Sequence, residues 1–275
     1  MDNSRAGRWA VLLSFPLILF LVAASGTGVV LPSIYDNETR AGAAQAIGSD
    51  WLNLTVVVPI LIVATVLTLR GGTRARLVWA GTVLYVVYDF VYYTLTSHFN
   101  SLFLVYCAVL GLAFYAVLGV LPSVSIEDTA KRYTRRLPAI ATAVLFLVIA
   151  LGAAVNWMKE MVPAVLSGEL PQGVREAGQF TEPAAVLDFA FVLPALTIIA
   201  ILLLLGKPLG FVFGPILLVF AGLLALLLTA MGLVMEARGF GPAFGGTLMT
   251  AVLAASAGML LALFLRVDKR RDVAA

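Results

Sequence analysis

Charged and polar residues divide this chain into eight long apolar runs. Each run has about 18 or more mostly apolar residues, enough to cross a hydrocarbon core of roughly 30 Å as a helix. Because backbone groups in lipid must find partners within the protein, helices are the expected solution. The alternating segments of about ten residues that a membrane β-barrel needs do not occur. The predicted spans are Trp9–Pro32, Trp51–Leu69, Leu77–Thr96, Ser101–Leu121, Leu137–Trp157, Ala184–Leu205, Leu209–Met235 and Phe244–Leu265.

Basic residues gather at the two termini and in alternate connections between these runs. Cytoplasmic segments of membrane proteins carry an excess of Lys and Arg, so these segments are predicted to lie inside. Only Arg40, Lys159, Arg175 and Arg238 fall in the outer connections. We therefore predict an all-α, polytopic transmembrane bundle with both termini in the cytoplasm. The inner basic residues are Arg5, Arg8, Arg70, Arg74, Arg76, Lys131, Arg132, Arg135, Arg136, Lys207, Arg266, Lys269, Arg270 and Arg271.

Composition supports this class and excludes several others. The chain is 61% hydrophobic and 12% charged, whereas a soluble domain carries about a quarter charged residues. One cysteine, Cys107, and one histidine, His98, leave no disulfide within the chain and no cluster of thiolates or imidazoles for a metal. No nucleotide-binding loop, serine-nucleophile or zinc-protease motif occurs. The sequence thus assigns no catalytic, cofactor-binding or metal-ligating residue.

The second and sixth spans begin alike. Asn53-Leu-Thr-Val-Val-Val-Pro59 opens one and Asp188-Phe-Ala-Phe-Val-Leu-Pro194 opens the other, and both runs end at a glycine, Gly71 or Gly206. The order of long and short connections also matches. We expect two tandem four-helix repeats, residues 1–136 and 137–275, that together form one membrane domain. Since four is an even number, the repeats enter the membrane in the same sense and are parallel.

The third span carries an unusual polar face. At about 100° per residue, Tyr85, Tyr88, Asp89 and Tyr92 fall within one helical stripe. An ionisable residue at membrane depth costs about 2.5–3.5 kcal/mol on insertion scales. Asp89 is therefore expected to have a hydrogen-bonding or charged partner, or a function that requires it. The corresponding positions of the seventh span are apolar. The polar face is therefore a candidate site in one half only.

The functional interpretation is an outward-facing pocket around Asp89, with further lining groups from other spans. A carboxylate among phenols suits a small cation or an amine, by charge and cation–π attraction, and it also suits a proton. The structural interpretation is that Asp89 ties helices together by hydrogen bonds and that the tyrosines form an interfacial belt. The candidate ligand-binding residues are Asp89, Tyr85, Tyr88, Tyr92, Asp188, Asn53, Tyr106 and His98.

Two outer connections are long, at about Ser33–Asp50 and Lys159–Pro183. Both mix acidic with apolar residues, so short helices on the membrane surface and plain solvated connectors are both open. The inner basic clusters are short, and anionic lipid headgroups explain them without nucleic acid. Small residues in the last span suit close packing within the chain or in a homo-oligomer.

Two runs, His98–Tyr106 and Val186–Pro194, resemble segments of uncharacterised bacterial membrane proteins of an actinobacterial type. The resemblance extends over most of the chain. It implies a bacterial cytoplasmic membrane and eight spans, but it brings no activity and no cofactor.

Three functions remain open from the sequence. The first is a transporter-like or small-molecule-binding protein with Asp89 in an outward-facing site. The second is a non-catalytic subunit, sensor or assembly factor, and the third is an enzyme that modifies a lipid or isoprenoid, with Asp89 or His98 as acid–base groups. The sequence favours a protein that is not an enzyme. A cavity that holds Asp89 and Asp188 would favour the first function, and His98 beside Asp89 would favour the third.

Overall fold

The computed structural model describes residues 7–120, 125–133, 136–239 and 244–266, and in these residues all regular structure is helical. Eight helical segments of this part of the chain are long and apolar enough to cross a membrane, as the sequence predicts, so the fold fits a multi-pass membrane protein. The elements are α2 (Arg8–Leu12), α3 (Ser14–Val30), η1 (Pro32–Tyr35), α4 (Arg40–Leu52), η2 (Asn53–Val57), α5 (Val58–Leu69), α6 (Thr73–Thr96), α7 (Phe103–Val120), α8 (Ile126–Arg132), α9 (Arg136–Ser167), α10 (Gln172–Glu176), α11 (Pro183–Leu187), η4 (Asp188–Val192), α12 (Leu193–Leu204), α13 (Pro208–Ala237) and α14 (Phe244–Phe264).

Two spans are longer than predicted, and both extend into the predicted long connections. The second span begins at Arg40 and runs through α4, η2 and α5 to Leu69. Thr39 starts it as an N-cap, because its hydroxyl accepts a hydrogen bond from the Gly42 N–H at 3.1 Å. The fifth span, α9, continues to Ser167. The spans therefore take up residues 40–50 and 159–167 of the two connections.

The second and sixth spans share a local widening. η2 and η4 are π-helical turns, and each lies just before a proline, Pro59 or Pro194. Proline lacks an N–H and its ring meets the carbonyl of the residue four before it, so the helix widens there instead of keeping its regular ladder. Asn53 and Asp188 are the first residues of the two turns.

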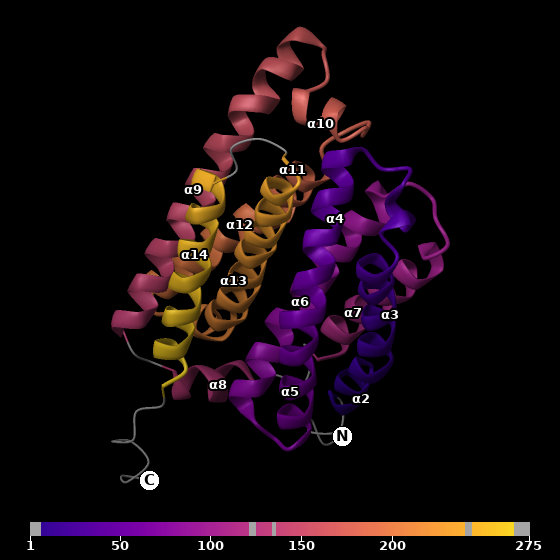
Figure 1. Ribbon diagram of the computed structural model, residues 1–275. Coiled ribbons are helices and arrows are strands. Elements are labelled where there is room, and N and C mark those ends of the chain that lie inside the picture. Colours follow the sequence, from indigo (N-terminus) through magenta and orange to yellow (C-terminus); the bar gives the residue numbers. More distant parts are fainter. Residues whose placement is uncertain (1–6, 121–124, 134–135, 240–243, 267–275) are drawn as a thin grey trace.

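α6 and α13 occupy the centre and pack against each other (Figure 1). α6 also contacts α5 and α7, whereas α13 contacts α4, α12 and α14. Glycines allow the two central crossings. A Cβ on Gly81 of α6 would lie 2.6 Å from the Cβ of Val219 in α13, and one on Gly48 of α4 would lie 2.7 Å from the Cα of Met231. α13 thus rests directly on the backbones of α4 and α6.

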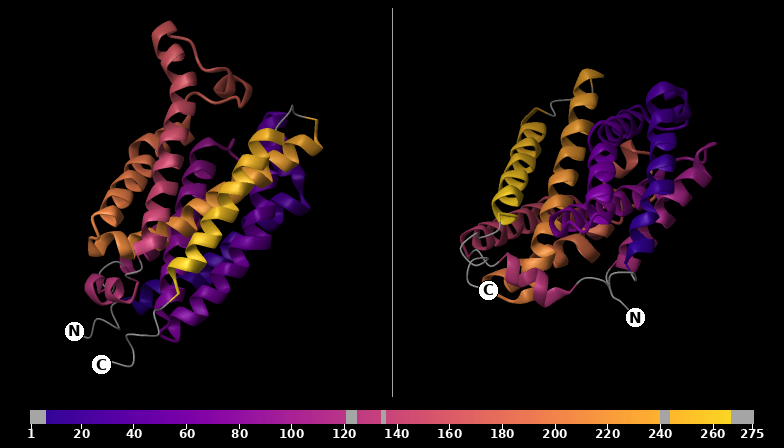
Figure 2. Two further views of the ribbon diagram at one scale, coloured as in Figure 1. Left: turned by 90° about the vertical axis from the view of Figure 1, so that its left-hand side faces the viewer. Right: turned by 90° about the horizontal axis from the view of Figure 1, so that it is seen from below.

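The described basic residues of the predicted inner segments lie in turns and helix ends around α8, at the lower end in Figure 1. We call this the α8 end and the opposite one the α10 end. At the α10 end α9 projects beyond its neighbours, and the chain folds back through α10 to α11 (Figure 2). Arg5, Arg135, Lys269, Arg270 and Arg271 lie outside the described residues.

We predict that Gly81→Ala destabilises the protein because the new methyl group meets the Ile216 carbonyl and Val219, which belong to a packed helix. Overpacking of this kind costs about 1–3 kcal/mol. Gly152→Ala is the matched control, since nothing lies within 4 Å of its Cβ position. Thermal unfolding in detergent should show a lower Tm for Gly81→Ala and an unchanged or higher Tm for Gly152→Ala. Equal Tm values would contradict a close α6–α13 crossing.

Candidate functional site

A cavity of about 590 Å³ lies towards the α10 end of the bundle, between α6, α9, α11 and the α13–α14 pair. This volume falls in the range of roughly 300–1,000 Å³ that small-molecule sites occupy. Among the described residues that line it, four are acidic and none is lysine or arginine. The acidic residues are Asp89, Glu160, Glu182 and Asp188.

Asp188 is held at the cavity wall by two neutral donors. The Tyr88 hydroxyl donates to its Oδ1 at 3.1 Å and the Trp157 indole N–H donates to its Oδ2 at 2.8 Å. These donors come from α6 and α9, so Asp188 links both helices to the π-turn η4. The carboxyl is half-buried and lines the cavity. It is therefore oriented by the protein and still reachable from the cavity.

Asp89 also lines the cavity, but it is more enclosed, with 2% of its surface exposed. The Asn53 amide donates to its Oδ2 at 2.8 Å, and the Ser49 hydroxyl lies 3.1 Å from Oδ1 and 3.2 Å from Oδ2. Tyr85 lies behind this group, where its hydroxyl donates to the side-chain amide oxygen of Asn53, Oδ1, at 3.4 Å. Asn53 and Tyr85 are buried and do not line the cavity, so they support Asp89 from the α4 side.

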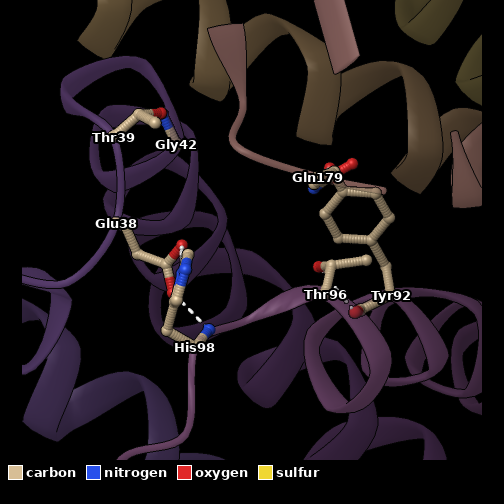
Figure 3. Close-up of polar contacts among 7 residues, drawn as sticks. All are labelled: Glu38, Thr39, Gly42, Tyr92, Thr96, His98 and Gln179. Carbon is tan, nitrogen blue, oxygen red and sulfur yellow. Dashed lines mark hydrogen bonds and ion pairs between the residues drawn. The ribbon is translucent and has the colours of Figure 1, made fainter. Parts of the chain in front are cut away.

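Tyr92 is the third aromatic residue of the cavity wall, beside Tyr88 and Trp157. Its hydroxyl accepts a hydrogen bond from the Gln179 side-chain amide at 3.1 Å, as Figure 3 shows. Gln179 belongs to the segment between α10 and α11, which therefore contacts α6 at the wall of the cavity.

His98 lies elsewhere, in the short turn after α6. Its Nδ1 is 2.9 Å from Glu38 Oε2, and its backbone N–H donates to Glu38 Oε1 at 2.7 Å (Figure 3). Tyr106 of α7 packs against Phe90 and Tyr93, also away from the cavity. The structure thus gathers Tyr88, Asp89, Tyr92 and Asp188 around one space, and it leaves His98 and Tyr106 outside.

A second buried carboxyl, Asp50, was not predicted because the sequence assigned it to a loop. Its Oδ2 accepts from the Tyr35 hydroxyl at 2.6 Å and its Oδ1 from the Tyr93 hydroxyl at 3.2 Å. Gly28 of α3 makes room for this pair, since a Cβ there would collide with Asp50 and with Tyr35. Burial, and then the nearby Asp50 carboxyl, raise the pKa of the Tyr35 hydroxyl, which keeps Tyr35 a donor.

Glu182 precedes α11 and differs from the other cavity acids in lying outside the spans. Burial raises the pKa of Glu182, and the neighbouring Glu160 and Asp188 carboxyls raise it further, while a backbone hydrogen bond from Ala184 opposes them. Glu182 thus shares the cavity with two acidic neighbours, and none of the described lining residues is lysine or arginine.

In the described part of the chain, no group of three or more His, Cys, Asp or Glu side chains is arranged to hold a metal ion. No protein-family model, curated protein or solved structure matches the chain. Fold and site together define a multi-pass helical membrane protein with an acidic cavity among its spans.

We predict that Asn53→Leu destabilises the fold because it leaves the buried Asp89 with one donor fewer. An unsatisfied buried polar group costs about 1–3 kcal/mol, and more when it is charged. Thr55→Val is the control, since Thr55 is exposed two residues further on and bonds only the Trp51 carbonyl of its own helix. Unfolding in a denaturing detergent should separate the two variants. If both unfold at the wild-type detergent fraction, the Asn53–Asp89 contact does not stabilise the bundle.

Proposed function

We propose that this chain is a transporter-like or small-molecule-binding membrane protein whose cavity takes a small organic cation or amine. The observation that carries the proposal is the charge of the cavity. Four acidic side chains line it and none of its described lining residues is basic. In a low-dielectric bundle such an imbalance attracts a cation and repels an anion or a carboxylate.

The aromatic residues of the cavity support the same ligand class. Tyr88, Tyr92 and Trp157 surround the space near Asp188, and aromatic faces attract ammonium groups by cation–π interaction. The hydroxyl of Tyr88 and the indole N–H of Trp157 already hold Asp188 in place. A bound ammonium ion would therefore meet a preoriented carboxylate.

The basic residues around α8 support one orientation of the protein in the membrane. By the positive-inside rule the α8 end faces the cytoplasm with both termini, and the cavity faces outward. The resemblance of two segments to uncharacterised bacterial membrane proteins favours a bacterial cytoplasmic membrane as the location.

Three features support the proposed duplication into residues 1–136 and 137–275. The π turns η2 and η4 stand at equivalent positions before Pro59 and Pro194. The spans end at Gly71 and Gly206, both with positive φ, which glycine adopts readily. Contacts within the first half also have counterparts in the second. The α6–α7 contact corresponds to α13–α14, α5–α6 corresponds to α12–α13, and α3–α7 corresponds to α9–α14.

The enzyme alternative, with Asp89 or His98 as acid–base groups, would be favoured by His98 lying beside Asp89. His98 instead contacts Glu38 in the turn after α6, and Asp89 is held by Ser49 and Asn53. The geometry of these residues therefore favours binding over acid–base chemistry.

We predict that Asp188→Asn weakens the binding of tetramethylammonium at least about tenfold, because it removes the accessible carboxylate and keeps the side-chain volume. Asp36→Asn is the control, since Asp36 is an exposed acid that does not line the cavity. Titration calorimetry on the purified protein in zwitterionic nanodiscs measures both dissociation constants. If Asp188→Asn binds tetramethylammonium as tightly as the wild type and Asp36→Asn loses this binding, the cation does not bind at Asp188.

We also predict that this binding strengthens as the pH rises from the ordinary glutamate value of 4.5. Because the pKa of Glu182 is raised, the folded protein keeps a proton on this carboxyl where a free glutamate has lost it, and a cation must displace that proton. The affinity for the cation is thus lowest at a pH below the ordinary glutamate pKa, and it levels off at a pH above the raised pKa of Glu182. Glu182→Gln should flatten the profile and Glu236→Gln, an exposed acid away from the cavity, should not. A profile that falls with rising pH would contradict a cation ligand.

A further inference from the structure

The cavity has two chemically different sets of lining residues. The acidic groups come from α6, α9 and the segment around α11, and all three aromatic groups come from α6 and α9. α13 contributes five large apolar side chains, and α14 adds Met249 beside two threonines. The α13 residues are Leu224, Leu227, Leu228, Met231 and Met235.

A small inorganic cation would use only one of these sets. At about 590 Å³ the cavity is of the size that holds drug-sized organic ligands, not a single ion. Leucine and methionine side chains gain by removing hydrocarbon from water, and they offer nothing to a hydrated ion. Both sets are satisfied by one molecule with a positive head and a hydrocarbon tail.

The charge of the cavity also limits which head groups the ligand can have. An amino acid or another zwitterion brings a carboxylate, which would meet four acidic residues and no described basic partner. A monovalent amine or quaternary ammonium ion avoids that repulsion. Methionine is flexible, so Met231, Met235 and Met249 suit tails of differing length and shape.

We propose that the ligand is an amphipathic amine or alkylammonium ion, with its head at Asp188 and its tail along Leu228 and the methionines of α13 and α14. This inference rests on the cation-binding function proposed above and names its substrate class.

A homologous series of n-alkyltrimethylammonium ions tests it, from tetramethylammonium to the dodecyl compound, on the full chain in zwitterionic nanodiscs. Each added CH₂ buried on the apolar wall should tighten Kd about fourfold, until the wall is covered. Empty nanodiscs and the Asp188→Asn variant measure partition into lipid. n-Alkanols of equal length test whether the charge is needed.

Leu228→Asn should weaken the longer ions at least about fivefold more than it weakens tetramethylammonium, because it makes the tail wall polar. Leu233→Asn is the matched control on the same helix, since Leu233 is exposed and does not line the cavity. Thermal unfolding of each variant shows that it is folded before binding is compared.

The outcomes separate the two proposals. If tetramethylammonium binds but longer chains bind no tighter, the cation site stands and the amphipathic ligand is overturned. The same conclusion follows if chain-length dependence survives in Asp188→Asn and in empty nanodiscs, or if alkanols compete equally well. If no member of the series binds, the cation-binding function itself fails.

Discussion

A carboxyl group at membrane depth needs hydrogen-bond donors from the protein, and the exchange of such donors between α4 and α6 organises this structure. Ser49 of α4 and Asn53, which follows α4 and begins η2, donate to Asp89 of α6, and the Tyr93 hydroxyl of α6 donates to Asp50 of α4. Each helix carries an acid that the other satisfies. Sliding or separating the two helices would therefore expose two buried carboxyls at once, which is more costly than losing apolar contacts of the same area.

The helices that take part in this exchange also border the cavity, through Gln45 of α4 and Tyr88, Asp89 and Tyr92 of α6. α4 lies beside the half of α6 nearer the α10 end, and the helix therefore begins as early as Arg40, where a loop was expected. α13 then crosses both helices at Gly48 and Gly81, where only a missing side chain permits the approach. Leucine and methionine side chains of α13 also line the cavity, so the helix that crosses α4 and α6 forms one of its walls.

Hydropathy predicted the eight spans well because hydrocarbon thickness dictates their length. It missed the start of the second span, since residues 40–50 are rich in Ala and Gly and contain Asp50, which lowers their hydropathy. Thr39, a good N-cap before an alanine-rich segment, was the available signal. Helical periodicity placed Tyr85, Tyr88 and Asp89 on one stripe of α6. It could not reveal that this stripe faces two neighbours, with Tyr85 towards α4 and Tyr88 towards the cavity, because that depends on which helices pack beside it.

The two π turns have the same local geometry, but their first residues make different kinds of contact. Asn53 and Asp188 both stand first in a widened turn before a proline, which aims each side chain at α6. The neutral Asn53 can donate, so it satisfies Asp89 and closes the packing between α4 and α6. Asp188 accepts hydrogen bonds from Tyr88 and Trp157 and lines the cavity. Leu224 of α13 also lines the cavity. The amide and the acid at these two turns thus make different contacts: Asn53 belongs to the buried packing around Asp89, and Asp188 belongs to the wall of the cavity.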